Sequence, residues 1–169
     1  MKILTISGSA RKDSANVRLL EGLPLLFPEH QIQRYTQLPQ LPLFHADWQD
    51  QPAPAAVEDW KAALRNAEGL VICTPEYLHN LPALLKNALE WVTASGELAG
   101  KKVLAISFTP HAPRGEKAMQ SLLWSLQALD AQVLAQLPLY QKEVAFHEGQ
   151  GLVDGATTEL LSAAFELFL

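Results

Sequence analysis

The stretch KILTISGSARKDSAN, residues 2–16, joins a short apolar run to a polar loop. Isoleucine and leucine dominate its first part, Lys2–Ser7, which predicts a strand that is buried on both faces of a sheet. After the loop, Asn16–Phe27 carries apolar side chains at helical spacing and stops at Pro28, which predicts a helix. The chain therefore opens with a strand, a polar loop and a helix.

The same alternation of strand and helix continues along the chain. Short apolar runs predict further strands at Gly69–Cys73, Lys102–Phe108 and Ala131–Leu137, and Gln31–Tyr35 is expected to be a more polar strand at an edge of the sheet. Amphipathic stretches predict further helices at Ala55–Ala67, Leu81–Thr93, Glu116–Leu129 and Asp154–Leu169. Four prolines within Leu38–Pro54 predict a loop. Alternation of this kind implies parallel strands joined by crossover helices, so we expect an α/β, three-layer sandwich with a five-stranded parallel sheet in the flavodoxin-like order 2-1-3-4-5.

Length and composition limit the classes of function. A chain of 169 residues, 49% apolar and 18% charged, suits one soluble domain that spans residues 1–169. The net charge of −5 argues against general binding to nucleic acid or to an anionic membrane. The single cysteine, Cys73, excludes an internal disulfide and is expected to be a core thiol. No apolar run reaches the roughly 18 residues of a membrane span, and we see no signal peptide, so we expect a cytoplasmic protein.

The loop after the first strand is expected to bind a phosphate. In sheets of this order, ligands bind beyond the carboxyl ends of the strands, at the switch point between strands one and three. Ser9, Ser14 and Asn16 can donate hydrogen bonds there, and Arg11 adds a charged fork. The helix that follows adds free backbone N–H groups and a partial positive charge. These features predict an anion site for a phosphate group.

A plainer interpretation of this loop stays open. Ser14 or Asn16 could serve only as a helix cap, and Arg11 could be a solvated surface charge. Two other phosphate loops are not indicated, because neither G-x-x-x-x-G-K nor G-x-G-x-x-G follows the strand. The histidines in the neighbouring loops, His79 and His111, lack the spacing of metal ligands, so we expect no metal site.

The stretch TPEYLHNLPALLKNALEW, residues 74–91, carries a second motif. Together with the first loop it resembles the NAD(P)H-dependent FMN reductase family, which includes chromate-, quinone- and azo-reducing flavoproteins. The phosphate loop of that family reads G-S-x-R-x-x-S-x-N, and its second signature reads T-P-E-Y-N, a short spacer, then P-x-x-L-K-N-A-x-[DE]-W. The residues that match are Gly8, Ser9, Arg11, Ser14 and Asn16 in the first motif, and Thr74, Pro75, Glu76, Tyr77, Pro82, Leu85, Lys86, Asn87, Ala88, Glu90 and Trp91 in the second.

The resemblance implies a set of cofactor-binding residues. Those that would hold the FMN phosphate are Ser9, Arg11, Ser14 and Asn16. Those that would border the isoalloxazine, largely through backbone groups, are Pro75, Glu76, Tyr77 and Leu78, the last standing where the family usually has asparagine. Those in the loop that would approach the pyrimidine side are Ser107, His111 and Gly115, in a segment where prolines replace the family's small residues.

The resemblance also implies an activity. We expect an oxidoreductase that takes hydride from NAD(P)H as substrate and passes electrons through bound FMN to a small-molecule acceptor such as a quinone or free flavin. No catalytic side chain is strictly required, because the flavin supplies the redox chemistry. Members of the family are typically dimers or tetramers, so we expect a homodimer or homotetramer.

Two other functions remain open from the sequence. The first is a one-electron carrier of the flavodoxin type, although such carriers are more acidic and usually lack the arginine of this loop. The second is a binding or regulatory protein of the same fold without flavin, which Leu78 and the proline-rich loop before Gly115 motivate.

Overall fold

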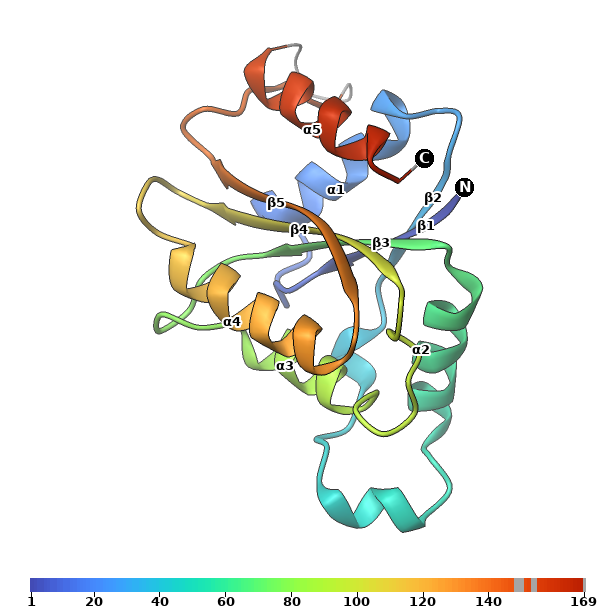
Figure 1. Ribbon diagram of the computed structural model, residues 1–169. Coiled ribbons are helices and arrows are strands. Elements are labelled where there is room, and N and C mark those ends of the chain that lie inside the picture. Colours follow the sequence, from blue (N-terminus) through green and yellow to red (C-terminus); the bar gives the residue numbers. More distant parts are fainter. Residues whose placement is uncertain (148–150, 153–154, 169) are drawn as a thin grey trace.

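A parallel sheet forms the centre of the computed structural model, which describes residues 1–147, 151–152 and 155–168. Its strands stand in the order β2-β1-β3-β4-β5, as the alternation of elements predicted (Figure 1). The bounds of the strands are β1 (Lys2–Ser7), β2 (Gln31–Tyr35), β3 (Gly69–Thr74), β4 (Lys102–Thr109) and β5 (Gln132–Tyr140). The flavodoxin-like order is therefore confirmed.

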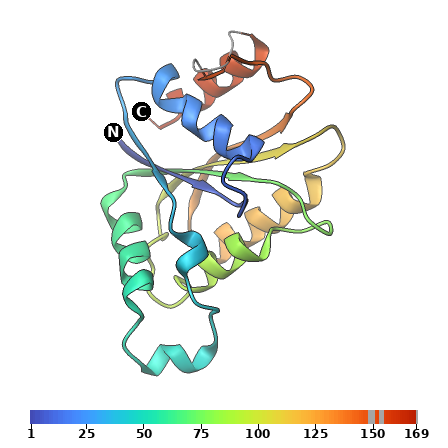
Figure 2. The same ribbon diagram turned by 180° about the vertical axis from the view of Figure 1, so that it is seen from behind.

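Helices cover both faces of the sheet (Figures 1 and 2). The helices on one face are α1 (Ala15–Leu26) and α5 (Ala156–Glu166). The helices on the other face are α2 (Ala55–Asn66), α3 (Ala83–Glu90) and α4 (Glu116–Ala128). This arrangement is the expected three-layer sandwich, and it brings the carboxyl ends of all five parallel strands to one edge.

Strand β3 shows why apolar runs predicted the centre of the sheet. All its residues are buried, and alternate side chains enter the two cores: Ile72 packs with the α2 and α3 side, and Val71 packs with the α1 and α5 side. Cys73 lies on the second side and is fully buried, which raises the pKa of its thiol and confirms it as a core residue.

Several elements differ from the prediction. Helix α3 begins later than predicted, because Pro82 is its N-cap, in extended conformation, rather than a residue of its first turn. The proline-rich segment contains two short 3-10 helices, η1 (Leu38–Gln40) and η2 (Ala46–Asp50). An antiparallel pair of short strands, β6 (Phe146–His147) and β7 (Gly151–Leu152), was not predicted. The predicted ends of the last helix, Asp154 and Leu169, lie outside the described residues.

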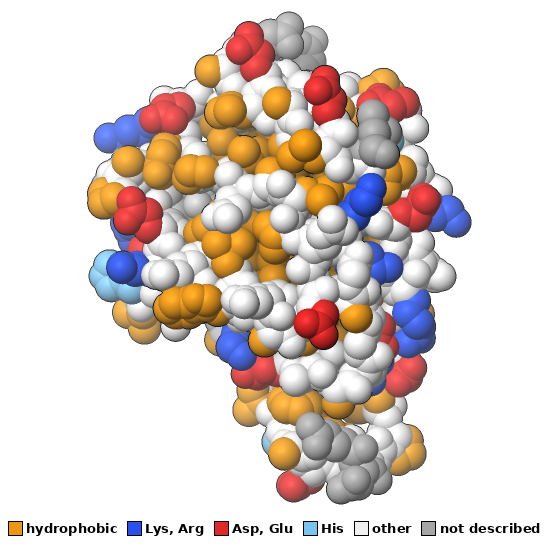
Figure 3. Space-filling view, in the orientation of Figure 1, with side chains coloured by type: hydrophobic (Ala, Val, Ile, Leu, Met, Phe, Trp, Pro, Cys, Tyr) orange, Lys and Arg blue, Asp and Glu red, His pale blue; other side chains and the backbone are white. Residues whose placement is uncertain are grey.

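Two surfaces extend beyond the core. The segment between β2 and α2 projects from the body of the molecule (Figures 1 and 2). On another side, β5 is one of the two edge strands of the sheet, and hydrophobic side chains gather on the face that displays it (Figure 3). The half-buried apolar residues of β5 are Val133, Leu134, Ala135 and Leu137. Across the described parts of the chain, no helix has the length and apolarity needed to cross a bilayer.

Candidate functional site

A cleft of about 400 Å³ opens at the carboxyl ends of the central strands. Its walls come from the loop before α1, the residues after β3, the end of β4 and the loop before α4. The predicted site residues that line it are Ser9, Arg11, Ser14, Asn16, Pro75, Glu76 and Tyr77. The fold therefore brings both sequence motifs to one cavity, whose volume lies in the usual range for cofactor sites, about 300–1,000 Å³.

The polar side chains of the first motif mostly shape their own loop. Ser14 is the N-cap of α1, and its Oγ accepts a hydrogen bond from the Val17 N–H at 3.2 Å. The Oγ of Ser9 accepts from the Arg11 N–H at 3.3 Å. The buried Asn16 amide donates to the Phe108 carbonyl at 2.9 Å and so fastens α1 to β4. The capping role that stood as an alternative for Ser14 is thus present in the structure.

The same loop still offers hydrogen-bond donors. The N–H groups of Ala15 and Asn16, in the first turn of α1, make no hydrogen bond to any other described residue. The hydroxyl hydrogens of Ser9 and Ser14 are also unused within residues 1–147, 151–152 and 155–168. No acidic residue stands in the first turn of α1. The end of this helix is therefore a set of donors aimed at the cleft, with the partial positive charge of the helix behind them.

Arg11 adds a full charge to these donors. It is exposed, and within the described chain its guanidinium forms no ion pair. A guanidinium that faces a cleft without a carboxylate partner is available to an anionic ligand.

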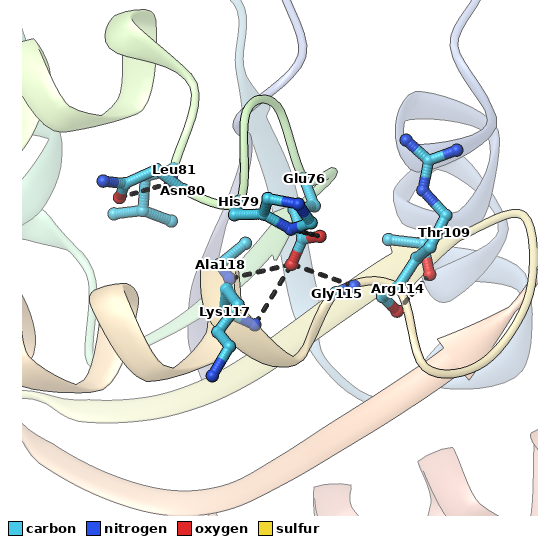
Figure 4. Close-up of polar contacts among 9 residues, drawn as sticks. All are labelled: Glu76, His79, Asn80, Leu81, Thr109, Arg114, Gly115, Lys117 and Ala118. Atoms are coloured by element: carbon cyan, nitrogen blue, oxygen red, sulfur yellow. Dashed lines mark hydrogen bonds and ion pairs between the residues drawn. The ribbon is translucent and has the colours of Figure 1, made fainter.

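Glu76 has a role that the motif did not reveal. Its side chain is 5% exposed and turns toward the start of α4 rather than into open space (Figure 4). Its Oε2 accepts hydrogen bonds from the backbone N–H groups of Gly115 at 3.0 Å, Lys117 at 3.1 Å and Ala118 at 3.1 Å. Its Oε1 lies 3.4 Å from Nδ1 of His79. Glu76 therefore joins the loop after β3 to the N-terminus of α4.

These contacts change the pKa of the Glu76 carboxyl group. Burial raises the pKa of Glu76, but the three backbone amides and His79 lower it by more, so the pKa lies below the usual value of a glutamate. The carboxylate is therefore ionised at neutral pH, and its charge is satisfied by the amides of α4.

A tight turn follows Glu76 at the rim of the cleft. Tyr77 and Asn80 exchange backbone hydrogen bonds of 3.1 and 3.0 Å. The two residues between them have positive φ angles, 50° for Leu78 and 57° for His79, as in a type I′ turn. Because the Tyr77 N–H is used within the turn, the residue offers the cleft its half-exposed side chain.

Four predicted residues lie elsewhere than on the cleft wall. Leu78 points into solvent at the tip of the turn and is 99% exposed. His111 is exposed, and its Nδ1 lies 2.9 Å from the Ala112 carbonyl oxygen. Ser107 is buried beneath Gly115, whose φ is 102° and where an added Cβ would come within 3.0 Å of Ser107 Oγ. The predicted contacts of Leu78, Ser107, His111 and Gly115 with a flavin ring remain predictions.

Other parts of the second motif serve the fold. Asn87 accepts a hydrogen bond from the Phe44 N–H at 2.8 Å. The side chains of Asn87 and Trp91 both donate to the Pro42 carbonyl, at 3.0 and 2.8 Å. These contacts fasten the projecting segment to α3 and its C-terminal end, and none of these residues lines the cleft.

Some lining residues carried no motif signal. They are Asp13, Arg18, Phe108, Thr109, Pro110, Arg114 and Gln141. Asp13 lies in the loop after the first strand, and Phe108, Thr109, Pro110 and Arg114 lie in the segment from Ser107 to Gly115, so these five stand in loops that the sequence had indicated. Arg18 in α1 and Gln141 after β5 stand outside those loops. In the described ranges, no group of three or more His, Cys, Asp or Glu side chains is arranged to hold a metal ion.

Comparison with known proteins identifies the family. The model of the family described as NADPH-dependent FMN reductase matches residues 1–143. The chain belongs to this family. It is 34% identical to a quinone reductase of Escherichia coli (strain K12) over 138 residues, which is 79% of this chain and 73% of that protein. It is also 34% identical to a 2-hydroxy-1,4-benzoquinone reductase of Burkholderia sp over 145 residues, 84% of this chain and 79% of that protein.

Solved structures agree on the fold of this FMN reductase family member. The flavoenzyme NAD(P)H:(acceptor) oxidoreductase FerB from Paracoccus denitrificans superposes with a TM-score of 0.81 at 22% identity, over 99% of this chain and 94% of that one. The resemblance predicted from the two motifs is thus confirmed at the level of family and fold.

The donor set before α1 fits the phosphate of FMN. A phosphate monoester is a dianion near neutral pH and accepts hydrogen bonds. The first turn of α1, the hydroxyl groups of Ser9 and Ser14, and the Arg11 guanidinium supply hydrogen-bond donors and positive charge at one end of the cleft.

Proposed function

We propose that this chain, residues 1–169, is a single FMN-binding domain that uses NAD(P)H to reduce a small-molecule acceptor such as a quinone. The observation that carries the proposal is the open donor set at the N-terminus of α1, which lies in the same cleft as Pro75 and Tyr77. The names of the two relatives, quinone reductase and 2-hydroxy-1,4-benzoquinone reductase, support a quinone as acceptor.

In this proposal the chain binds and orients, and bound FMN supplies the redox chemistry. Arg11 and the first amides of α1 hold the phosphate, with the hydroxyl groups of Ser9 and Ser14 as further donors. Pro75 and the side chain of Tyr77 border the flavin ring. Glu76 acts behind them, because its bonds to α4 fix the position of the loop that carries both residues.

Two measurements test this function. An absorbance spectrum of the purified protein, before and after addition of FMN, should show flavin bands that remain with the protein on gel filtration. Oxidation of NADH or NADPH by the loaded protein should then depend on an added quinone. A flavodoxin-type carrier would bind FMN without consuming the nucleotide, and a protein that takes up no FMN would contradict the proposal.

We also propose that the protein forms a homodimer or homotetramer in the cytoplasm. The projecting segment exposes Leu43, α4 exposes Trp124, and the edge strand β5 displays apolar side chains (Figure 3). Surfaces of this kind suit association with a second copy. Light scattering of the purified protein tests the first point, and a monomer at micromolar concentration would contradict it.

A further inference from the structure

Arg114 lies in the same cleft as the donor set of α1 and belongs to neither sequence motif. It stands in the loop between β4 and α4, next to Gly115. Its side chain extends away from the bonds that surround Glu76 (Figure 4). In the part of the chain that the structure describes, its guanidinium pairs with no carboxylate, although the side chain is exposed to the cleft.

The backbone of Arg114 is fixed on both sides. Its carbonyl accepts a hydrogen bond of 2.7 Å from the hydroxyl of Thr109, which is buried. Its N–H donates to the His111 carbonyl at 3.1 Å. The next residue, Gly115, donates to Glu76 at 3.0 Å. Because the backbone of Arg114 is already held by these hydrogen bonds, little backbone entropy is lost when its guanidinium binds a ligand.

Two arginines of the cleft lining, Arg11 and Arg114, have neither an ion-pair partner nor an aromatic partner among the described residues. The charge of Glu76 is satisfied by the amides of α4. Asp13 is the other carboxylate on the lining, and it forms no ion pair with any described residue. The Arg18 guanidinium lies 5.3 Å from the centre of the Phe146 ring and so has an aromatic partner. Arg11 and Arg114 remain, in a chain whose net charge is −5. Two guanidinium groups match the charge of one phosphate dianion.

We propose that Arg114 is a second binding residue for the FMN phosphate, together with Arg11 and the N-terminus of α1, which line the same cleft. This inference rests on the proposed function, because it assumes that FMN occupies the cleft. It assigns to the loop before α4 a part in selecting FMN over riboflavin, which has the same ring but no phosphate.

The test is a titration of the flavin-free protein with FMN and with riboflavin, followed by protein and flavin fluorescence. For Arg114→Ala we expect FMN binding to weaken by about tenfold to a hundredfold, as for loss of a charge-assisted hydrogen bond, and riboflavin binding to change less than about twofold. Arg114→Lys should keep part of the FMN preference, because it keeps the charge and loses the planar fork. Thermal unfolding without flavin shows whether each variant is folded.

The matched control is Arg65→Ala. It removes the same charge from α2, where Arg65 pairs with Glu97 at 3.1 Å, outside the cleft. This variant should bind FMN as the unmodified protein does. If it weakens FMN binding as much as Arg114→Ala, the effect is one of net charge and the proposal is wrong.

Other outcomes separate the inference from the proposed function. If the unmodified protein binds FMN and Arg114→Ala leaves the preference for FMN over riboflavin unchanged, the inference fails and the proposed function stands. If Arg114→Ala weakens binding of 2′,5′-ADP and not of FMN, the arginine serves the phosphate of the nicotinamide donor and the inference is wrong. If the unmodified protein binds no FMN, both fail.

Discussion

Helices α1 and α4 begin at the same edge of the sheet and border the same cleft, yet their N-termini are used in opposite ways. At α4, the buried carboxylate of Glu76 accepts from three backbone N–H groups. At α1, no acidic side chain stands in the first turn, and the exposed Arg11 adds positive charge. A helix N-terminus attracts anions in either case.

The difference indicates that the N-terminus of α4 has a structural role and that the N-terminus of α1 is available to bind a ligand. The chain supplies its own anion to α4, so this end fixes the loop after β3 against the loop after β4. The chain places no anion of its own at the N-terminus of α1, so this end can bind an anionic ligand. The family relationship suggests that this ligand is the phosphate of FMN. Substitutions at the two helix ends test these two roles separately.

The largest effect is expected at α1. Replacing Arg11 and Ser14 together by alanine removes the charged fork and one hydroxyl donor, which should weaken FMN binding by about 3 kcal/mol, or roughly a hundredfold. Fluorescence titration of the flavin-free protein measures this change. Ser14→Ala alone serves as the control for the lost helix cap, which should lower stability by about 1 kcal/mol. Unchanged FMN affinity in the double variant would place the phosphate elsewhere.

A smaller effect is expected at α4, and on stability rather than on phosphate selection. Glu76→Ala leaves three backbone amides without their carboxylate and should lower the free energy of unfolding by about 2 kcal/mol. Glu76→Gln keeps an acceptor oxygen and should lose about 1 kcal/mol. Urea unfolding of the flavin-free variants gives both values. A loss of FMN preference over riboflavin in Glu76→Gln, with stability intact, would mean that the two ends are not separate.

The contribution of Glu76 to the free energy of unfolding should also depend on pH. The folded-state pKa of Glu76 is lowered, so its contribution to stability is fully present above the unfolded-state pKa of about 4.3 and is lost as the pH falls through the lower folded-state pKa. The difference in unfolding free energy between the unmodified protein and Glu76→Gln should therefore shrink below about pH 4.3. Urea unfolding at several pH values measures it, and a constant difference would contradict the role of the ionised carboxylate.

The smallest effect concerns the turn that follows Glu76. Leu78 has a φ of 50°, which an L-residue with a side chain adopts at a cost of about 1–2 kcal/mol, and glycine loses about 0.5–1 kcal/mol in chain entropy. Leu78→Gly should therefore stabilise the protein by about 0.5 kcal/mol in urea unfolding. Leu43→Gly is the control, because Leu43 is also exposed but has no positive φ, and it should not stabilise. Destabilisation by Leu78→Gly would mean that the Leu78 side chain is needed in the turn.

The fold was accessible from the sequence because its signals are local. The apolar run at Lys2–Ser7 coincides with β1, since parallel strands covered by helices need such runs. The more polar stretch Gln31–Tyr35 coincides with β2, which lies at one edge of the sheet and is only partly buried. The exit of β3 at Thr74 and the start of α4 at Glu116 were also close to their predicted places.

The site was only partly accessible, because several of its contacts depend on tertiary structure. The spacing of the first motif predicted that Ser9, Arg11 and Ser14 lie at the binding site, and all three line the cleft. It could not show that the amide of Asn16 donates to the carbonyl of Phe108 in β4. It could not show that the carboxylate of Glu76 turns to α4, since their bonds link residues about forty positions apart. Arg114 stands in no motif, and its place follows from the path of one loop.

The most direct test of the open end of α1 compares the dissociation constants of FMN and riboflavin for the unmodified protein without flavin. The two ligands share the ring and differ in the phosphate. If the phosphate occupies the donor set of α1, FMN should bind at least about a hundredfold more tightly than riboflavin, and high salt should reduce the difference. Equal affinity for the two ligands would contradict the account.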